Sequence, residues 1–144
     1  MRRGISFVSD SSSDQVLKKV FSNIECEDND WIIDDVSNAF DPGLLKGKFA
    51  GNMFKKTIQE QDDYQFVRIR RYPLGEIIDK IDSYEDFLAS SCTLILLCVD
   101  GGFYDIYSKN QRELEIISDI CNDLDITVET ITDDTDARYH LHAR

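Results

Sequence analysis

The sequence predicts a single α+β domain, with helices packed on a mixed or largely antiparallel sheet. Three observations support this fold class. Strand-like segments alternate with amphipathic helical segments along 144 residues, a length that suits one domain. The tight turn Asp100-Gly101-Gly102 has hairpin chemistry and favours antiparallel pairing of its two flanking strands. Hydrophobic residues make up 42% of the chain, which is enough to build a buried core.

The first third of the chain predicts strand, helix and strand. Residues 4–8 alternate in polarity, as a half-buried strand does. A serine-rich turn then supplies an N-cap, and apolar side chains at helical spacing predict an amphipathic helix over residues 14–25. Residues 31–36 predict a second strand, and the Asp-Pro-Gly sequence at 41–43 predicts a turn.

The middle of the chain is less regular. Residues 44–62 fit either a short helix or an irregular excursion, and residues 75–81 are ambiguous. Between them, residues 64–72 alternate well and predict a strand that stops at the following proline. A short helix is expected after Ser83, which is its predicted N-cap, with Asp86 three residues on as in a capping box.

An apolar run over residues 93–99 predicts the central strand. It is apolar on both faces, so we expect both faces to be covered. Residues 103–107 predict the strand that pairs back on it through the glycine turn.

The last third of the chain predicts a helix, a strand and a tail. Asn110 is the predicted N-cap of a helix over residues 111–124, with Glu113 at the capping-box position. Residues 126–131 predict the last strand. Residues 133–144 are expected to be a polar tail that frays, as chain ends often do.

The net charge of −12 is concentrated in two segments. Residues 25–41 hold seven acids and residues 113–136 hold nine, with no Lys or Arg in either segment. Such a field attracts a basic partner and repels nucleic acid and anionic membranes. One interpretation is a pair of solvated faces that keep the protein soluble. The other is an interaction surface for a basic protein.

We take the interaction surface as the leading hypothesis for function. Trp31 lies among the acids of the first segment, where it suits an interface hot spot, although it suits the core equally well. The predicted partner-binding residues are Glu27, Asp28, Asp30, Trp31, Asp34, Asp35, Asp133, Asp134 and Asp136.

The three arginines Arg68, Arg70 and Arg71 form the basic cluster of the sequence. Arg68 and Arg70 share a strand face, so they either clamp an anion or pair with the acidic segments. Pairing is the favoured interpretation. An anion clamp would instead suggest an enzyme or small-ligand-binding domain with a pocket near Arg68 and Arg70, which is the alternative function.

The chain has no catalytic or phosphate-binding motif that we recognise, so we expect neither enzymatic activity nor a cofactor. His140 and His142 lie on one side of an extended segment, but zinc would need a third ligand held nearby. The acids at 133–136 lack the spacing and the glycine of a calcium loop. We therefore expect no metal site.

The four cysteines and the hydropathy pattern indicate the compartment. No cysteine pair has the Cys-x-x-Cys spacing, and there is no secretory signal, so we expect free thiols in the cytoplasm. The longest apolar run has six residues (94–99), whereas a spanning helix needs about 20.

Several segments resemble an uncharacterised family of small proteins from Bacillus-type bacteria. They are the opening Met1-Arg2-Arg3-Gly4-Ile5-Ser6-Phe7, the run Tyr84-Glu85-Asp86-Phe87-Leu88, the strand Leu94-Ile95-Leu96-Leu97 and the ending Ile131-Thr132-Asp133-Asp134. This resemblance covers nearly the whole chain and implies no activity. In size and charge the chain also resembles immunity proteins of polymorphic toxin systems. That looser resemblance implies a basic partner, a nuclease toxin domain, neutralised by an acidic surface.

Overall fold

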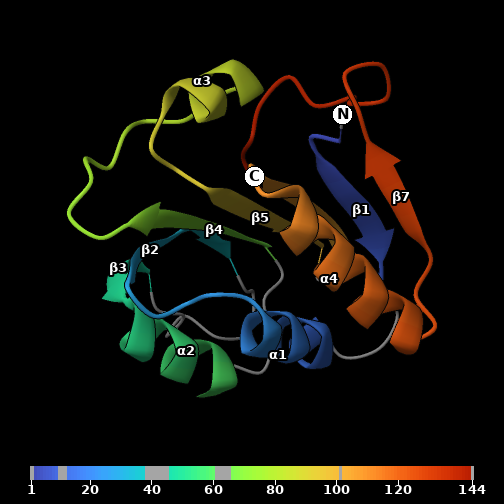
Figure 1. The fold of residues 1–144 in the computed structure, drawn as a ribbon, viewed down its shortest axis with the longest axis horizontal. Coiled ribbons are helices and arrows are strands. Elements are labelled where there is room, and N and C mark those ends of the chain that lie inside the picture. The colour runs from blue at the N-terminus through green and yellow to red at the C-terminus, as the bar shows by residue number, and fades with distance from the viewer. Residues whose placement is uncertain (1, 10–12, 38–45, 61–65, 101, 144) are drawn as a thin grey trace.

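Seven strands of the computed structural model form one antiparallel sheet in the order β3-β2-β4-β5-β6-β1-β7 (Figure 1). The structure describes residues 2–9, 13–37, 46–60, 66–100 and 102–143. The strands are β1 (Gly4–Val8), β2 (Asn29–Ser37), β3 (Gly47–Ala50), β4 (Phe66–Pro73), β5 (Leu94–Val99), β6 (Phe103–Ser108) and β7 (Val128–Ile131). Neighbouring strands all run antiparallel. The predicted α+β class is confirmed.

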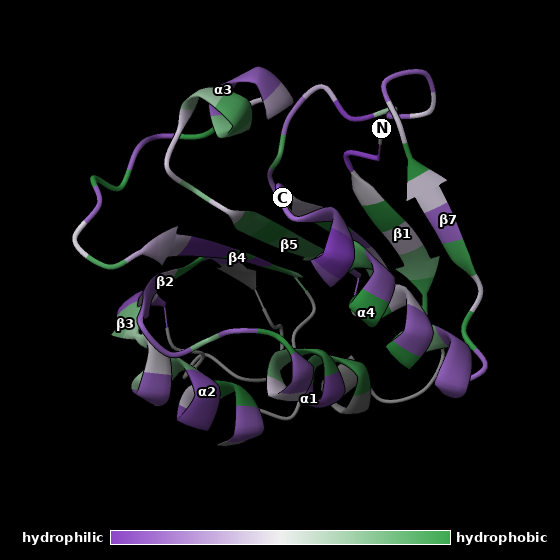
Figure 2. Cartoon of the chain, in the orientation of Figure 1, coloured by the Kyte–Doolittle hydropathy of each residue, from purple (hydrophilic) through white to green (hydrophobic). Residues whose placement is uncertain are grey.

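Helices cover both faces of this sheet. The helices α1 (Ser13–Asn23), α2 (Gly51–Glu60) and α4 (Gln111–Asp123) pack on what we call the first face, and α3 (Tyr84–Ala89) packs on the second. Figure 2 shows that α1, α2 and α4 each carry a hydrophobic and a hydrophilic side, as amphipathic surface helices do. None of the helices in the described ranges is long and apolar enough to cross a membrane.

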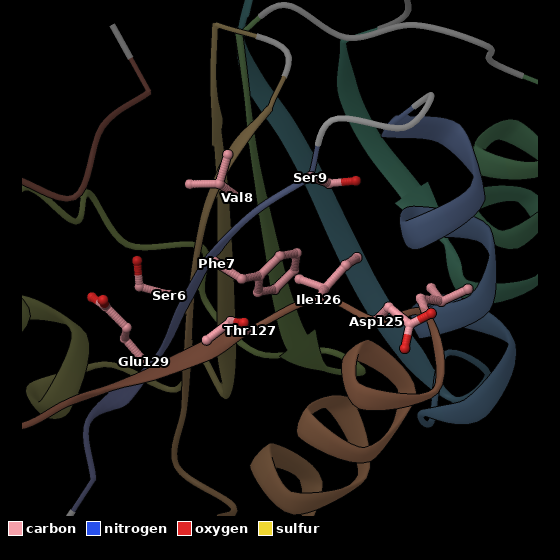
Figure 3. A pocket seen from close by; sticks show the side chains of 9 residues that line it. Ser6, Phe7, Val8, Ser9, Asp125, Ile126, Thr127 and Glu129 are labelled. Carbon is pink, nitrogen blue, oxygen red and sulfur yellow. The ribbon is translucent and has the colours of Figure 1, made fainter.

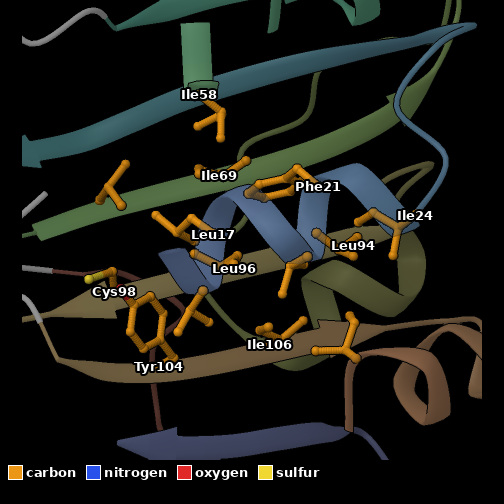
Figure 4. Packing of buried hydrophobic residues seen from close by; sticks show 14 of the residues in the cluster. Leu17, Phe21, Ile24, Ile58, Ile69, Leu94, Leu96, Cys98, Tyr104 and Ile106 are labelled. Carbon is orange, nitrogen blue, oxygen red and sulfur yellow. The ribbon is translucent and has the colours of Figure 1, made fainter. Parts of the chain in front are cut away.

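Aromatic rings and aliphatic side chains build the core of the first face. Trp31 stacks on Phe54 with ring centroids 4.0 Å apart, and Phe21 meets both rings edge-on. The Trp31 indole nitrogen donates a hydrogen bond to the carbonyl of Cys26 at 2.9 Å. Figure 4 shows α1 across the sheet, with Leu17 and Phe21 in the core. Trp31 is 0% exposed and therefore lies in the core, which is the alternative position that it suited equally well in the sequence.

The central strand β5 is buried on both sides, as its apolar run predicted. Leu94 and Leu96 belong to the core of the first face, whereas Ile95 and Leu97 belong to that of the second. This alternation follows from the two-residue period of a strand. The second core also contains Phe87 of α3.

The C-terminal segment packs on the second face, so the expectation that it frays is wrong. Leu141 is 1% exposed and Ala143 is 4% exposed, and both belong to the second core. The Leu141 amide donates to the carbonyl of Asp82 at 2.8 Å. Two apolar side chains with strand-like spacing anchor the segment, and its otherwise polar composition concealed them.

The N-terminal strand β1 lies inside the sheet, between β6 and β7. Its residues pair with both neighbours, as Ile5 does with Ile106 and Thr130. Gly4 permits this close approach, because a Cβ atom at that position would lie 2.0 Å from the carbonyl oxygen of Ile106.

Most sequence predictions of individual elements are confirmed. The Ser83–Asp86 capping box is present, and the Asn110 side chain accepts from two backbone amides at the start of α4. The ambiguous segment 44–62 contains β3 and α2 where it is described, while the predicted turn at 41–43 lies outside the described residues.

Candidate functional site

The two arginines that share a strand face pair with the first acidic segment. Asp34 lies opposite Arg68 across β2 and β4, and Arg68 donates to both of its carboxylate oxygens at 2.8 Å. Arg70 donates to the same carboxylate at 3.1 Å. Arg68 also donates to the carbonyls of Ile81 and Leu141. Both guanidinium groups are therefore bonded internally, as the favoured interpretation predicted.

A β-bulge turns Asp35 toward the same face as Asp34. Consecutive strand residues normally face opposite sides, but the register shifts after Asp34, and Asp35 has a left-handed φ of 52°. The Asp35 carboxylate lies 3.0 Å from His142 Nδ1 and accepts from the Ala143 amide at 3.2 Å. The other imidazole nitrogen lies 2.8 Å from Asp82, so the ring bridges two carboxylates. This bridge fastens the C-terminal segment.

Arg71 pairs with the second acidic segment on the first face. Its two terminal nitrogens donate to the two oxygens of Glu113, each at 2.8 Å, and both side chains are more than nine-tenths buried. Arg71 Nε donates to Thr93 Oγ1, and the Ser108 hydroxyl donates to Glu113. Glu113 therefore joins α4 to β4, and the capping-box role that its position predicted is wrong because its carboxylate is committed to Arg71.

The predicted partner-binding acids fall into an internal and an exposed group. The internal group is Asp30, Asp34, Asp35 and Asp136, and the exposed group is Glu27, Asp28, Asp133 and Asp134. The exposed acids do not form one surface. One pair precedes β2, the other follows β7, and four strands separate β2 from β7 in the sheet.

A groove of about 530 Å³ opens where β1 and β7 diverge (Figure 3). Its walls are residues 6–9 of β1 and the following chain, the connection 124–127, and Glu129 of β7. The apolar side chains of Phe7 and Ile126 lie in it, with Asp125 and Glu129 among its polar residues. A second cavity of about 180 Å³ lies beside Arg138, and Arg68 and Arg70 line neither cavity.

The end of α4 sets the shape of this groove. The Ile126 amide donates to the carbonyl of Cys121 at 2.8 Å, and the Asp125 amide donates to that of Asn122 at 3.0 Å. These two bonds, with Asp125 at a left-handed φ of 59°, form a Schellman motif. The motif reverses the chain, so that Ile126 packs on the core and the side chain of Asp125 is exposed.

Asp125 and Glu129 line the groove, and further exposed acids lie on α4 and in the segment that follows β7. We call this set the β7 acidic surface; it consists of Asp119, Asp123, Asp125, Glu129, Asp133 and Asp134. Among the residues that the structure describes, only Asp133 of this set has an ion pair, with Arg3 at 2.9 Å. The surface therefore carries negative charge that the described fold leaves almost unpaired.

Two exposed apolar side chains lie at the same end of the sheet. Val8 lines the groove and is 51% exposed, and its partner across β1 and β6, Phe103, is 55% exposed. An exposed aliphatic and aromatic pair beside a charged rim has the composition of a protein contact site.

Two further observations concern the metal-ligating side chains and the thiols of the described residues. No group of three or more His, Cys, Asp or Glu side chains in the described ranges could hold a metal ion. All four cysteines are buried, and burial raises the pKa of Cys26, Cys92 and Cys121 to about 11, so these thiols stay protonated near neutral pH.

Sequence reasoning missed the groove and most of the acids around it. Asp119, Asp123, Asp125 and Glu129 belong to the second acidic segment but were not among the predicted partner-binding residues. Helical spacing places Asp119 and Asp123 on one stripe of α4, a signal that the sequence does contain. The groove depends on the divergence of β1 and β7, which no local pattern reveals.

Comparisons with known proteins place the chain among uncharacterised bacterial proteins. A family described as protein of unknown function (DUF2691) matches residues 2–142. The chain is 26% identical over 152 residues to the uncharacterized protein YncE of Bacillus subtilis (strain 168), covering 98% of this chain and 99% of that protein. No solved structure matches significantly. The predicted resemblance to an uncharacterised Bacillus-type family is supported by these findings.

Proposed function

We propose a function from the surface of the chain itself, because the chain belongs to the DUF2691 family, whose description names no activity. The proposed function is that of an acidic binding domain, which docks on a basic protein through the β7 acidic surface. The observation that carries the proposal is the set of exposed, almost unpaired acids on α4, on β7 and in the adjoining segments, two of which line a groove together with Phe7, Val8 and Ile126.

Two of these acids lie at positions where they reduce the stability of the fold. Asp119 and Asp123 are like charges four residues apart on α4, an arrangement that destabilises a helix by about 0.2–0.5 kcal/mol. Both lie toward the C-terminal half of α4, where the helix dipole favours cations, and the last turn has no basic residue. Helix stability therefore does not explain these acids, which is consistent with a role in solubility or in partner binding.

The acids that pair with buried arginines differ in role from the acids of the β7 acidic surface. Asp34 and Glu113 hold buried arginines and are structural. The acids of the β7 acidic surface, in contrast, are exposed beside Val8 and the groove. An apolar centre with a charged rim suits a partner that inserts a hydrophobic side chain and presents Lys or Arg around it.

A basic nuclease toxin domain is the partner class that suits this surface best. Nucleic-acid-binding proteins carry a basic patch for phosphates. A row of carboxylates can occupy such a patch and block it. In this form of the proposal the chain acts as an immunity protein.

The alternative function, a ligand pocket near Arg68 and Arg70, has less support. Arg68 and Arg70 are at least nine-tenths buried, and their bonded donors reach Asp34, the Tyr72 hydroxyl and main-chain carbonyls. Among the described residues, the buried Nε of Arg70 has no hydrogen-bond partner. An anion would have to displace Asp34 to reach them.

The test compares two variants that lose the same charge. Asp123→Asn with Glu129→Gln removes two acids from the β7 acidic surface. The control, Asp79→Asn with Glu85→Gln, removes two exposed acids between β4 and β5, before and within α3. Each tagged protein is incubated with host lysate at about 0.05 M and about 0.5 M salt, because screening weakens exposed charge interactions.

The expected result is a basic protein retained at low salt by the wild type and the control, and lost both at high salt and with Asp123→Asn/Glu129→Gln. Capture of no basic protein, or equal capture by the two variants, would contradict the proposal.

A further inference from the structure

We infer that the free edge of β7 binds an extended basic segment of the partner as an additional strand, with one of its apolar side chains in the groove. This inference rests on the proposed function and specifies how the partner docks. Three observations carry it: the orientation of the β7 backbone, the position of the groove, and the charge of this edge.

The backbone of β7 has unpaired groups on its outer side. β7 is the last strand of the sheet, and its neighbour on the inner side is β1. The Ile131 carbonyl accepts from Arg3, next to β1, whereas the Thr130 carbonyl accepts from the Thr135 hydroxyl, away from β1. Because backbone direction alternates along a strand, Val128 and Thr130 direct their N–H groups outward. Such an edge can pair with another strand.

The groove begins where the β1–β7 pairing ends. The last pair is Phe7 with Val128, and the groove is lined by residues on both sides of this pair, including Val8 and Ile126 beyond it. A strand added along β7 would therefore pass the mouth of the groove. Its alternating side chains would place an apolar group near Phe7 and Ile126 (Figure 3).

The negative charge at the β7 edge indicates which kind of segment can pair with it. Glu129 lies on β7 itself, Asp125 precedes it, and Asp133 and Asp134 follow it. These acids repel a second copy of a chain with net charge −12 and attract Lys or Arg. The opposite edge strand, β3, carries the exposed Lys48 instead, so a basic strand would be directed to β7.

The experiment uses three synthetic peptides with the ¹⁵N-labelled full chain. The first alternates Lys with Val or Leu over seven residues. The second has the same sequence with its valine and leucine nitrogens N-methylated, and the third has its lysine nitrogens N-methylated. An added strand directs the N–H groups of alternate residues toward β7 and those of the other residues away from it. Methylation of the inward set should abolish pairing, and methylation of the outward set should leave binding intact.

The expected result is that amide shift changes are confined to residues 6–9 and 124–131, with one methylated peptide binding about tenfold more weakly or worse. In a second measurement, Thr130→Pro removes an outward N–H and should weaken the first peptide similarly, because the bonds of β7 to β1 do not use that group. Ile77→Pro, at an exposed position between β4 and α3, is the matched proline control and should bind the first peptide as the wild type does.

The outcomes separate this inference from the proposed function. Salt-sensitive binding that is indifferent to both N-methylations and to Thr130→Pro would overturn strand addition while leaving the acidic docking surface standing. Shift changes spread over acids far from β7 would overturn strand addition as well. An absence of binding by all three peptides, together with no basic partner from lysate, would overturn both.

Discussion

Removing the charge of Glu113 should be the most destabilising conservative change in the first-face core. The substitution Glu113→Gln keeps the volume of the side chain but leaves the Arg71 guanidinium without its counter-ion, in a site where both side chains are less than 10% exposed. Breaking a buried pair from one side costs about 3–5 kcal/mol. Arg71 keeps its bonds to Thr93 and to the Glu25 carbonyl, so we expect the lower end, about 3 kcal/mol.

Urea unfolding followed by tryptophan fluorescence measures this loss directly. Trp31 is the single tryptophan and is fully buried. The guanidinium carbon of Arg71 lies over the indole ring, 5.8 Å from the ring centroid. With a denaturant slope of about 2 kcal/mol per M, the midpoint should fall by about 1.5 M. The melting temperature should fall by about 10 °C for a chain of this length.

A matched control and a double variant make the reasoning refutable. Glu115→Gln removes an acid from the same helix, but its partner Arg112 is 77% exposed, so the expected loss is below about 1 kcal/mol. Replacing both buried partners, Arg71→Met with Glu113→Leu, should recover much of the stability. If Glu113→Gln unfolds at the same urea concentration as Glu115→Gln, the argument from burial is wrong.

Three further predictions concern the thiols, the C-terminal segment and the end of α4. Burial raises the pKa of Cys92 to about 11, so a thiol reagent at pH 8 should label the folded protein very slowly and all four cysteines at once in urea; prompt labelling would contradict this. The hydrogen bond to His142 lowers the pKa of Asp82 in the folded protein below its ordinary value of 3.8. The ionised Asp82 side chain therefore contributes its full stabilisation above pH 3.8, and this stabilisation is lost as the pH falls through the lower pKa of the folded state. The urea midpoints of the wild type and Asp82→Asn should therefore converge below that pH, and a constant gap would count against the bridge. Asp125→Gly should raise stability by about 0.5–1 kcal/mol in the same assay, because glycine adopts the left-handed φ without strain; a loss of stability would show that Asp125 has another structural role.

Local sequence signals predicted the elements well. The Ser83 and Asn110 caps and the doubly buried β5 all lie where periodicity and capping rules placed them. These features depend on interactions within a few residues, or on burial that repeats along one element. The sequence contains that information directly.

Long-range pairing explains what the sequence could not predict. The favoured pairing of Arg68 with an acid was correct, but naming Asp34 required the β2–β4 register. The bulge that turns Asp35 toward His142 has no sequence signature at that position. Glu113 is at the position that a local capping rule favours, yet its carboxylate bonds to Arg71, 42 residues away. An unpaired buried arginine would destabilise the fold more than an uncapped helix end, so the ion pair forms instead of the cap.

The position of β1 between β6 and β7 has a consequence for the order in which the chain can fold during synthesis. β1 pairs only with β6 and β7, whose residues are made about a hundred positions later. At about 5–20 residues per second, Ile5 and Phe7 leave the ribosome roughly 6–25 s before β7 does. The nascent N-terminus must therefore remain without its strand partners for most of translation. β1 can therefore complete its pairing only after the residues of β7 have emerged, so this part of the sheet depends on residues 128–131.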